Sequence, residues 1–228
     1  MHRTLEPISA KFRSGDAVTV VAFGDSITAG SQIDPERDES IVYHKQWHDR
    51  LAAEHAKLNL TIVNRGVPGH KIDHAHERVA AEVIEPNPDA VIVAFGINDC
   101  WDGPERIDHF ERELSRLVWR IRSGARSTAI ILMTTNMLNH RSSPEALKLA
   151  WFAEQTAAVQ TSGWTTHYMN RVREVAGERD VPLADGYKRW EQARVRGVDT
   201  DSLLANLANH PNRDGHALLA EALYDVLH

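Results

Sequence analysis

The sequence predicts a three-layer α/β domain, in which helices cover both faces of a parallel five-stranded sheet. Five short apolar runs, rich in valine and isoleucine and bounded by turn residues, have the length and composition of buried strands. The segments between them carry apolar residues at helical spacing. Strands that alternate with helices form parallel sheets whose two faces are both covered, which gives the predicted architecture.

The strands are predicted in chain order at residues 17–23, 60–63, 90–95, 128–134 and 181–184. A helix is expected before the second strand, where Trp47, Leu51 and His55 share a face. Another is expected before the fourth strand, with apolar residues at positions 107, 110, 114, 117, 118 and 121.

Two more helical segments are predicted in the second half of the chain. A long one begins near residues 143–145, breaks near Ser162 and Gly163, and resumes toward Gly177. The last helix follows residues 211–215 and has an apolar stripe. Since neither a repeat nor a linker divides the chain, a single domain over residues 1–228 is expected.

Composition narrows the classes of partner and compartment. The formal net charge is −6, and basic residues are scattered among acidic ones, which argues against a nucleic-acid or membrane surface as partner. The single cysteine, Cys100, excludes an intramolecular disulfide. The N-terminal residues lack the apolar core of a secretory signal, so a cytoplasmic location is expected.

The first polar motif, Gly24-Asp25-Ser26, follows the first predicted strand. A hydroxyl at a strand-to-helix corner is a position where nucleophiles are commonly displayed, so Ser26 is the first candidate for catalysis. The same three residues are also ordinary turn and helix-capping chemistry, which is the alternative interpretation.

Two further loops are expected at the same edge of the sheet, because ligands of such folds bind outside the carboxyl ends of the strands. Residues 64–69 follow the second strand and end in Gly69, and residues 96–99 follow the third and include Asn98. Ester hydrolysis needs a nucleophile, a base and hydrogen-bond donors for the oxyanion. Ser26 offers the nucleophile, and a glycine NH and the Asn98 amide offer the hydrogen-bond donors. His210, before the final helix, is the best-placed base.

These four blocks, in this order, resemble those of the SGNH, or GDSL-type, hydrolases, a family of esterases and lipases with a flavodoxin-like sheet. The resemblance implies that Ser26 attacks the ester and that His210 moves the proton. It also implies an oxyanion hole made by Ser26 NH, Gly69 NH and the Asn98 amide, with no metal or organic cofactor. The expected partner is a small-molecule ester with a short acyl chain, because no apolar lid of the kind that long-chain lipases use is evident. Among such esters, an acetylated carbohydrate is preferred.

One position departs from the family pattern, since Leu207 stands where the family usually has an aspartate, three residues before the histidine. The group that orients His210 is therefore left open. The candidates are a backbone carbonyl or one of four nearby carboxylates, those of Asp185, Asp199, Asp201 and Asp214.

Three other functions are alternatives to a short-chain esterase. A lipase or thioesterase is possible within the same fold. A metal-dependent hydrolase is suggested by His70, His74 and His76, the first two at the spacing of helical zinc ligands. A catalytically inactive binding domain is the third.

Aromatic residues near the predicted loops have two interpretations. Tyr43, His44, Trp47 and Trp101 could rim the site, where aromatic rings often stack on sugars. For Trp47 the alternative is that it packs as the first core residue of its helix.

Overall fold

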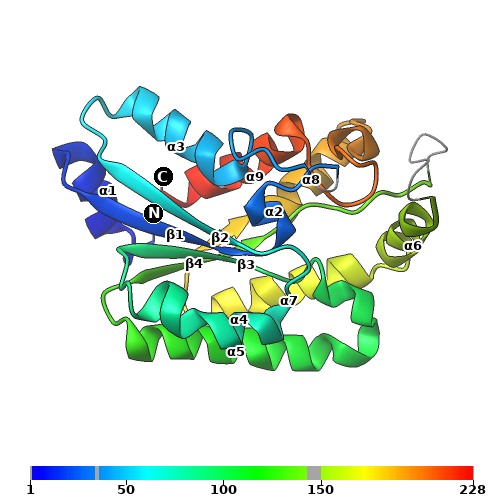
Figure 1. The fold of residues 1–228 in the computed structure, drawn as a ribbon, viewed down its shortest axis with the longest axis horizontal. Coiled ribbons are helices and arrows are strands. Elements are labelled where there is room, and N and C mark those ends of the chain that lie inside the picture. The colour runs from blue at the N-terminus through cyan, green and yellow to red at the C-terminus, as the bar shows by residue number, and fades with distance from the viewer. Residues whose placement is uncertain (1, 34–35, 143–149, 228) are drawn as a thin grey trace.

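The centre of the computed structural model, which describes residues 2–33, 36–142 and 150–227, is a parallel sheet of five strands (Figure 1). The strands run in the order β2-β1-β3-β4-β5. Every neighbouring pair is parallel, which confirms the predicted sheet. Their bounds are Val18–Gly24 for β1, Leu60–Gly66 for β2, Ala90–Ala94 for β3, Ala129–Thr134 for β4 and Leu183–Asp185 for β5.

Helices cover both faces of the sheet, which confirms the three layers (Figure 1). On one face lie α3 (Tyr43–Glu54), α8 (Gly186–Val195) and α9 (Arg213–Val226). The other face is covered by α4 (Ile72–Val79), α5 (Ile107–Gly124) and α7 (Trp164–Glu178). The remaining α-helices described are α1 (Glu6–Ser14), the short α2 (Ser26–Ala29) and α6 (Ala150–Thr161).

The core forms as the apolar pattern predicts. All residues of β3 and β4 are buried, because helices lie on both sides of these central strands. The six apolar positions predicted for α5 are all buried against the sheet. In the part of the chain that the structure describes, no helix is both long enough and apolar enough to cross a bilayer.

Two strands differ from their predicted bounds by more than one residue. β2 continues to Gly66 because Asn64, Arg65 and Gly66 pair with the last residues of β1. Their polar side chains end the apolar pattern while the backbone ladder continues. β5 begins only at Leu183, following Pro182, which has no NH to donate to a ladder.

The predicted break between two helices is confirmed, since α6 ends at Thr161 and α7 begins at Trp164. Gly163 lies between them with φ +84°, a left-handed conformation that suits glycine. The predicted start of this segment, residues 143–145, lies outside the described residues.

From β1 the chain adds β2 on one side and then β3 on the other, so the direction in which strands are added reverses between the neighbouring strands β1 and β3. Ligands of open α/β sheets bind in the crevice outside such a switch point. Ser26 follows β1 and Asn98 follows β3, so the fold brings the predicted loops to this edge.

Candidate active site

Ser26 is the first residue of α2 and directly follows the corner after β1. Asp25 caps this helix, since its Oδ1 accepts a hydrogen bond from the Ile27 NH at 2.9 Å. The capping role proposed as an alternative for this motif therefore belongs to Asp25. Ser26 is 3% exposed, and its hydroxyl is not used as the cap.

Two glycines let α2 lie against the ends of the strands. Gly24 and Gly66 are paired in adjacent strands. A Cβ added to Gly66 would lie 2.2 Å from the Ala29 nitrogen, and one added to Gly24 would lie 2.2 Å from Thr28 Oγ1. Since real Cβ atoms do not approach so closely, only glycine at both positions permits this packing.

Gly69 lies in the loop that leaves β2 beside this corner. The loop begins with a hydrogen bond from the Val67 NH to the Gly24 carbonyl at 3.1 Å. Gly69 has φ +76° and open space around it, with no atom within 4 Å of an added Cβ. A backbone NH in such an open turn is accessible to a ligand.

Asn98 is held against the loop that contains Gly69. Its Nδ2 donates to the His70 carbonyl at 3.0 Å. An amide nitrogen has two hydrogens, so the second remains available as a donor. Two further contacts join the same segments: Asp99 Oδ1 accepts from the Ile72 NH at 3.0 Å, and Lys71 Nζ donates to Asp102 at 2.5 Å. The two predicted oxyanion donors outside α2 are thus on segments bonded to each other.

His210 contacts the loop that follows α2. Its Nδ1 lies 2.8 Å from the backbone carbonyl oxygen of Gln32. A carbonyl can only accept, so Nδ1 carries the proton in this contact, and in the neutral ring the basic lone pair is then on Nε2. The tautomer needed for a general base is therefore set by a main-chain group.

The Gln32 side chain and Asn206 hold the same histidine in place. Gln32 Nε2 donates to the Pro211 carbonyl at 3.0 Å. Asn206 Oδ1 accepts from the NH groups of Ala208, Asn209 and His210 at 3.2, 3.0 and 3.0 Å. Neither residue was predicted from the sequence, since a glutamine in a loop and an asparagine in a turn carry no catalytic pattern.

Three of the four candidate carboxylates have other partners, and the fourth is exposed. Asp185 bonds Thr134 and Arg173, Asp199 bonds Arg141, and Asp201 accepts from the NH groups of residues 140 and 141. Asp214 is exposed in the first turn of α9. Among the described residues, no hydrogen bond joins one of these four carboxylates to His210. The His210 Nδ1 atom lies 2.8 Å from the Gln32 carbonyl oxygen and 3.3 Å from Asn206 Nδ2.

Two buried carboxyl groups stand behind these loops. Burial, together with the charge of Asp99, raises the pKa of Asp25 to about 7. Burial likewise raises the pKa of Asp99 to about 7. The Oδ2 atoms of both residues are buried without a hydrogen-bond partner in the described structure. Both residues bond backbone NH groups through Oδ1, so they hold loops in position.

The model of the GDSL-like lipase/acylhydrolase family matches residues 22–218 of this chain, a range that includes Ser26, the two loops and His210. The chain belongs to this family. It is therefore a carboxylic ester hydrolase with a serine nucleophile.

Relatives in the GDSL-like family cover almost the whole chain. The uncharacterized lipoprotein YqeF of Bacillus subtilis is 31% identical over 221 residues, 90% of this chain and 88% of the relative. An acetylxylan esterase of Geobacillus stearothermophilus is 31% identical over 226 residues, 93% of this chain and 94% of the relative. The crystal structure of the acetylxylan esterase Axe2 aligns with a TM-score of 0.70 at 22% identity, over 92% of this chain and 94% of Axe2. The name of the first relative gives no support to the predicted cytoplasmic location.

Other Axe2 structures bear on the position of Leu207 in this GDSL-like chain. They are catalytic mutants in which a serine, an aspartate or a histidine is replaced by alanine, the aspartate standing three residues before the histidine. At that spacing before His210 this chain has Leu207, whose φ is +57°. Leucine rarely adopts this conformation, and the Asn206 bonds described above hold the turn that imposes it.

The histidine-rich segment next to Gly69 is used for contacts within the protein. The His70 and His74 rings stack with centroids 4.5 Å apart, and His70 Nδ1 lies 3.0 Å from Arg78 Nη1. His76 Nε2 lies 3.0 Å from the Glu113 carbonyl oxygen. Within the described ranges, no group of three or more potential ligands has the arrangement of a metal site.

Three of the aromatic-rim candidates are core residues instead. Tyr43, His44 and Trp47 are buried on α3, because this helix turns that face toward the sheet. The rim interpretation is wrong for Tyr43 and His44, and the core interpretation is confirmed for Trp47. Trp101 is the member that stays partly exposed.

Proposed function

We propose that this protein hydrolyses short-chain carboxylic esters, and specifically acetyl esters of a carbohydrate, through an acyl-enzyme on Ser26. The contact between His210 Nδ1 and the Gln32 carbonyl is the observation that supports this most directly. It fixes the tautomer of the only histidine bonded to the loop after α2 in the described structure, and leaves Nε2 as the base. An inactive binding domain would have no need of this arrangement.

The mechanism follows from the chemistry of these groups. His210 Nε2 takes the proton of the Ser26 hydroxyl while Oγ attacks the ester carbon. The NH groups of Ser26 and Gly69 and the second Asn98 hydrogen donate to the oxyanion that forms. His210 then gives its proton to the departing alcohol. A water molecule, deprotonated by the same nitrogen, releases the acetate and restores Ser26.

The carbohydrate part of the proposal rests on similarity. The relative that is an acetylxylan esterase matches nearly its full length, at 31% identity. Lipase or thioesterase activity stays an alternative within the family, and long acyl chains distinguish it. A preference for decanoyl over acetyl esters would overturn the proposed substrate class.

The first experiment compares p-nitrophenyl acetate hydrolysis by wild type, Ser26→Ala and His210→Ala. Both variants should lose about a thousandfold or more in kcat, because they remove members of one catalytic unit. Ser123→Ala and His167→Ala, at exposed positions on α5 and α7, are matched controls that should keep wild-type rates. Activity should also survive EDTA. Activity that persists in Ser26→Ala, or that disappears with EDTA, contradicts the serine mechanism.

The backbone-carbonyl role has its own test. Asp185→Asn, Asp199→Asn, Asp201→Asn and Asp214→Asn should each keep kcat per folded molecule within about threefold of wild type, since none of these carboxylates bonds His210. A hundredfold loss of kcat in one of them, with unchanged circular dichroism, would assign the orienting role to that carboxylate.

A further inference from the structure

Three aromatic rings form a continuous cluster outside the catalytic groups. The Trp101 and Phe152 rings stack with centroids 5.3 Å apart and planes 11° apart. Trp151 meets Phe152 edge to face at 5.8 Å. Trp101 comes from the 3₁₀ turn after β3, and the other two from the start of α6. We call Trp101, Trp151 and Phe152 the aromatic platform.

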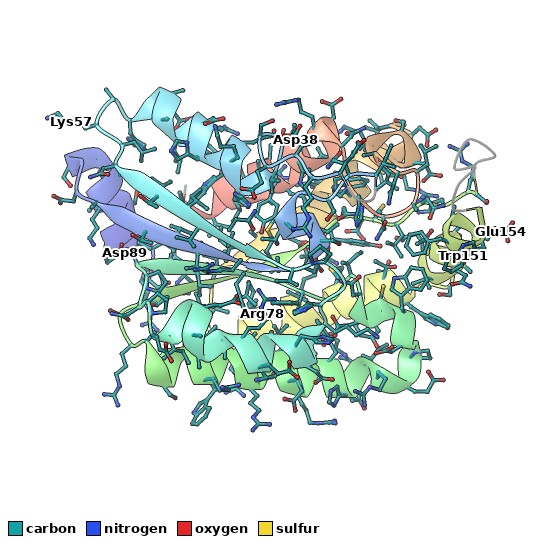
Figure 2. All side chains as sticks on the ribbon, viewed as in Figure 1. Asp38, Lys57, Arg78, Asp89, Trp151 and Glu154 are labelled. Atoms are coloured by element: carbon teal, nitrogen blue, oxygen red, sulfur yellow. The ribbon has the colours of Figure 1, made fainter. Side chains whose placement is uncertain are left out.

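The platform is continuous with the candidate active site. Trp101 stands three residues after Asn98, in the segment that Lys71 and Ile72 bond to the loop containing Gly69. α6 lies at the end of the molecule toward which the strands point (Figure 1). Figure 2 shows Trp151 on α6 at this same end. Trp101 therefore connects the platform to the segment that contains Asn98.

Trp151 presents a large part of its surface to solvent. It is 61% exposed, although its ring has apolar neighbours to pack against. Exposed aromatic surface next to polar groups is typical of ligand-binding sites. The Lys71–Asp102 ion pair supplies such polar groups close to Trp101. A flat apolar face flanked by hydrogen-bonding groups fits a sugar ring, which has apolar C–H faces and a hydroxyl-bearing rim.

We propose that the aromatic platform is a sugar-binding subsite, which holds a pyranose ring of an acetylated oligosaccharide next to the unit that carries the ester. This inference rests on the proposed function and extends it from the reacting acetyl group to the neighbouring sugar. Stacking on the platform contributes to binding of the oligosaccharide alone, because a simple acetate ester does not extend beyond the catalytic groups.

The test is Trp151→Ala, assayed on an acetylated xylo-oligosaccharide, on methyl acetate and on methyl decanoate. For the oligosaccharide, KM should rise about three- to tenfold, as expected for the loss of one aromatic stacking contact, while kcat changes little. Methyl acetate hydrolysis should be unchanged. Trp119→Ala is the matched control, since Trp119 is 59% exposed on α5, and it should match wild type on all three substrates.

Each other outcome overturns the inference in a distinct way. Equal kinetics of Trp151→Ala and Trp119→Ala on the oligosaccharide would show that the platform does not bind sugar, with the esterase function intact. A selective loss on methyl decanoate would make the platform an acyl-chain site. Wild-type hydrolysis of methyl acetate without hydrolysis of the oligosaccharide would exclude the sugar class, and no hydrolysis of any ester would overturn the proposed function itself.

A second readout is independent of hydrolysis. Ser26→Ala should bind unacetylated xylohexaose with a change in tryptophan fluorescence, and Ser26→Ala/Trp151→Ala should bind it at least threefold more weakly. Equal affinities of the two variants for xylohexaose would contradict the subsite.

Discussion

At the scale of single residues, the Asn98 side chain combines a structural hydrogen bond with its proposed role as an oxyanion donor. One hydrogen of its amide holds the His70 carbonyl, which fixes the loop containing Gly69. The other is the donor proposed for the oxyanion. A donor that already makes one bond is held in position before the reaction, so it needs no reorganisation when charge develops on the substrate.

Replacing this amide should therefore affect turnover more than binding. Asn98→Ala is expected to lower kcat about a hundredfold with little change in KM, as for loss of one oxyanion donor. Steady-state kinetics on p-nitrophenyl acetate measures this, and the exposed Asn59→Ala serves as control. If KM rises while kcat is unchanged, Asn98 binds the ground state and the proposed oxyanion role is wrong.

At the scale of elements, two glycines of the α6–α7 region both have room for a side chain but differ in backbone conformation. Neither Gly163 nor Gly177 has an atom within 4 Å of an added Cβ. Gly163 has φ +84° between the helices, whereas Gly177 lies inside α7 without a positive φ. A methyl group at these positions thus changes backbone energetics without causing a clash.

The two substitutions to alanine should have opposite effects on stability. Gly163→Ala is expected to lower the free energy of unfolding by about 1 kcal/mol, because it forces a left-handed conformation on an L-residue. Gly177→Ala is expected to raise it by about 0.5 kcal/mol, because alanine loses less backbone entropy in a helix. Urea denaturation measures both, and effects of the same sign would refute the argument from φ.

At the scale of the whole molecule, four buried titratable groups have opposite effects on how the free energy of unfolding depends on pH. Burial raises the pKa of Asp25 and Asp99 to about 7, and lowers that of His44 to about 4 and of His216 to about 3. The aspartates contribute stability that is complete below about pH 4 and is lost as pH rises toward 7. The histidines contribute stability that is complete above their unfolded pKa near 6.5 and is lost as pH falls toward 4.

Between about pH 4 and 6.5 these contributions should largely cancel in the wild type. Each group changes the free energy of unfolding by about 1.4 kcal/mol per pH unit. As pH rises, the two aspartates lower this free energy and the two histidines raise it. In Asp25→Asn/Asp99→Asn only the histidine part remains, so stability should rise steeply with pH. Urea denaturation at pH 4.5, 5.5 and 6.5 measures the slope, with the exposed Asp16→Asn as control. A slope equal to that of wild type would show that the aspartates are ionised when folded.

The sequence predicted the architecture well because apolar strands and helix stripes are local patterns. It also placed Ser26, Gly69 and Asn98 on loops that the sheet brings to one edge. Helices α1 and α8 were not predicted. Both are short and rich in charged residues, and only a few of their side chains, such as Phe12 and Trp190, pack in the core. Nor did the sequence identify Gln32, whose contact with His210 joins positions 178 residues apart.

The main-chain contact to His210 changes what mutagenesis can reveal in this chain. Where a side-chain carboxylate orients a catalytic base, a single substitution deletes it. Here the acceptor is a peptide carbonyl, which every amino acid supplies at position 32. Alanine scanning would therefore not remove the carbonyl that is proposed to orient the base, although Gln32→Ala would remove the side-chain bond to the Pro211 carbonyl. Only a change in the peptide bond itself, such as an ester linkage between residues 32 and 33, would weaken the acceptor directly.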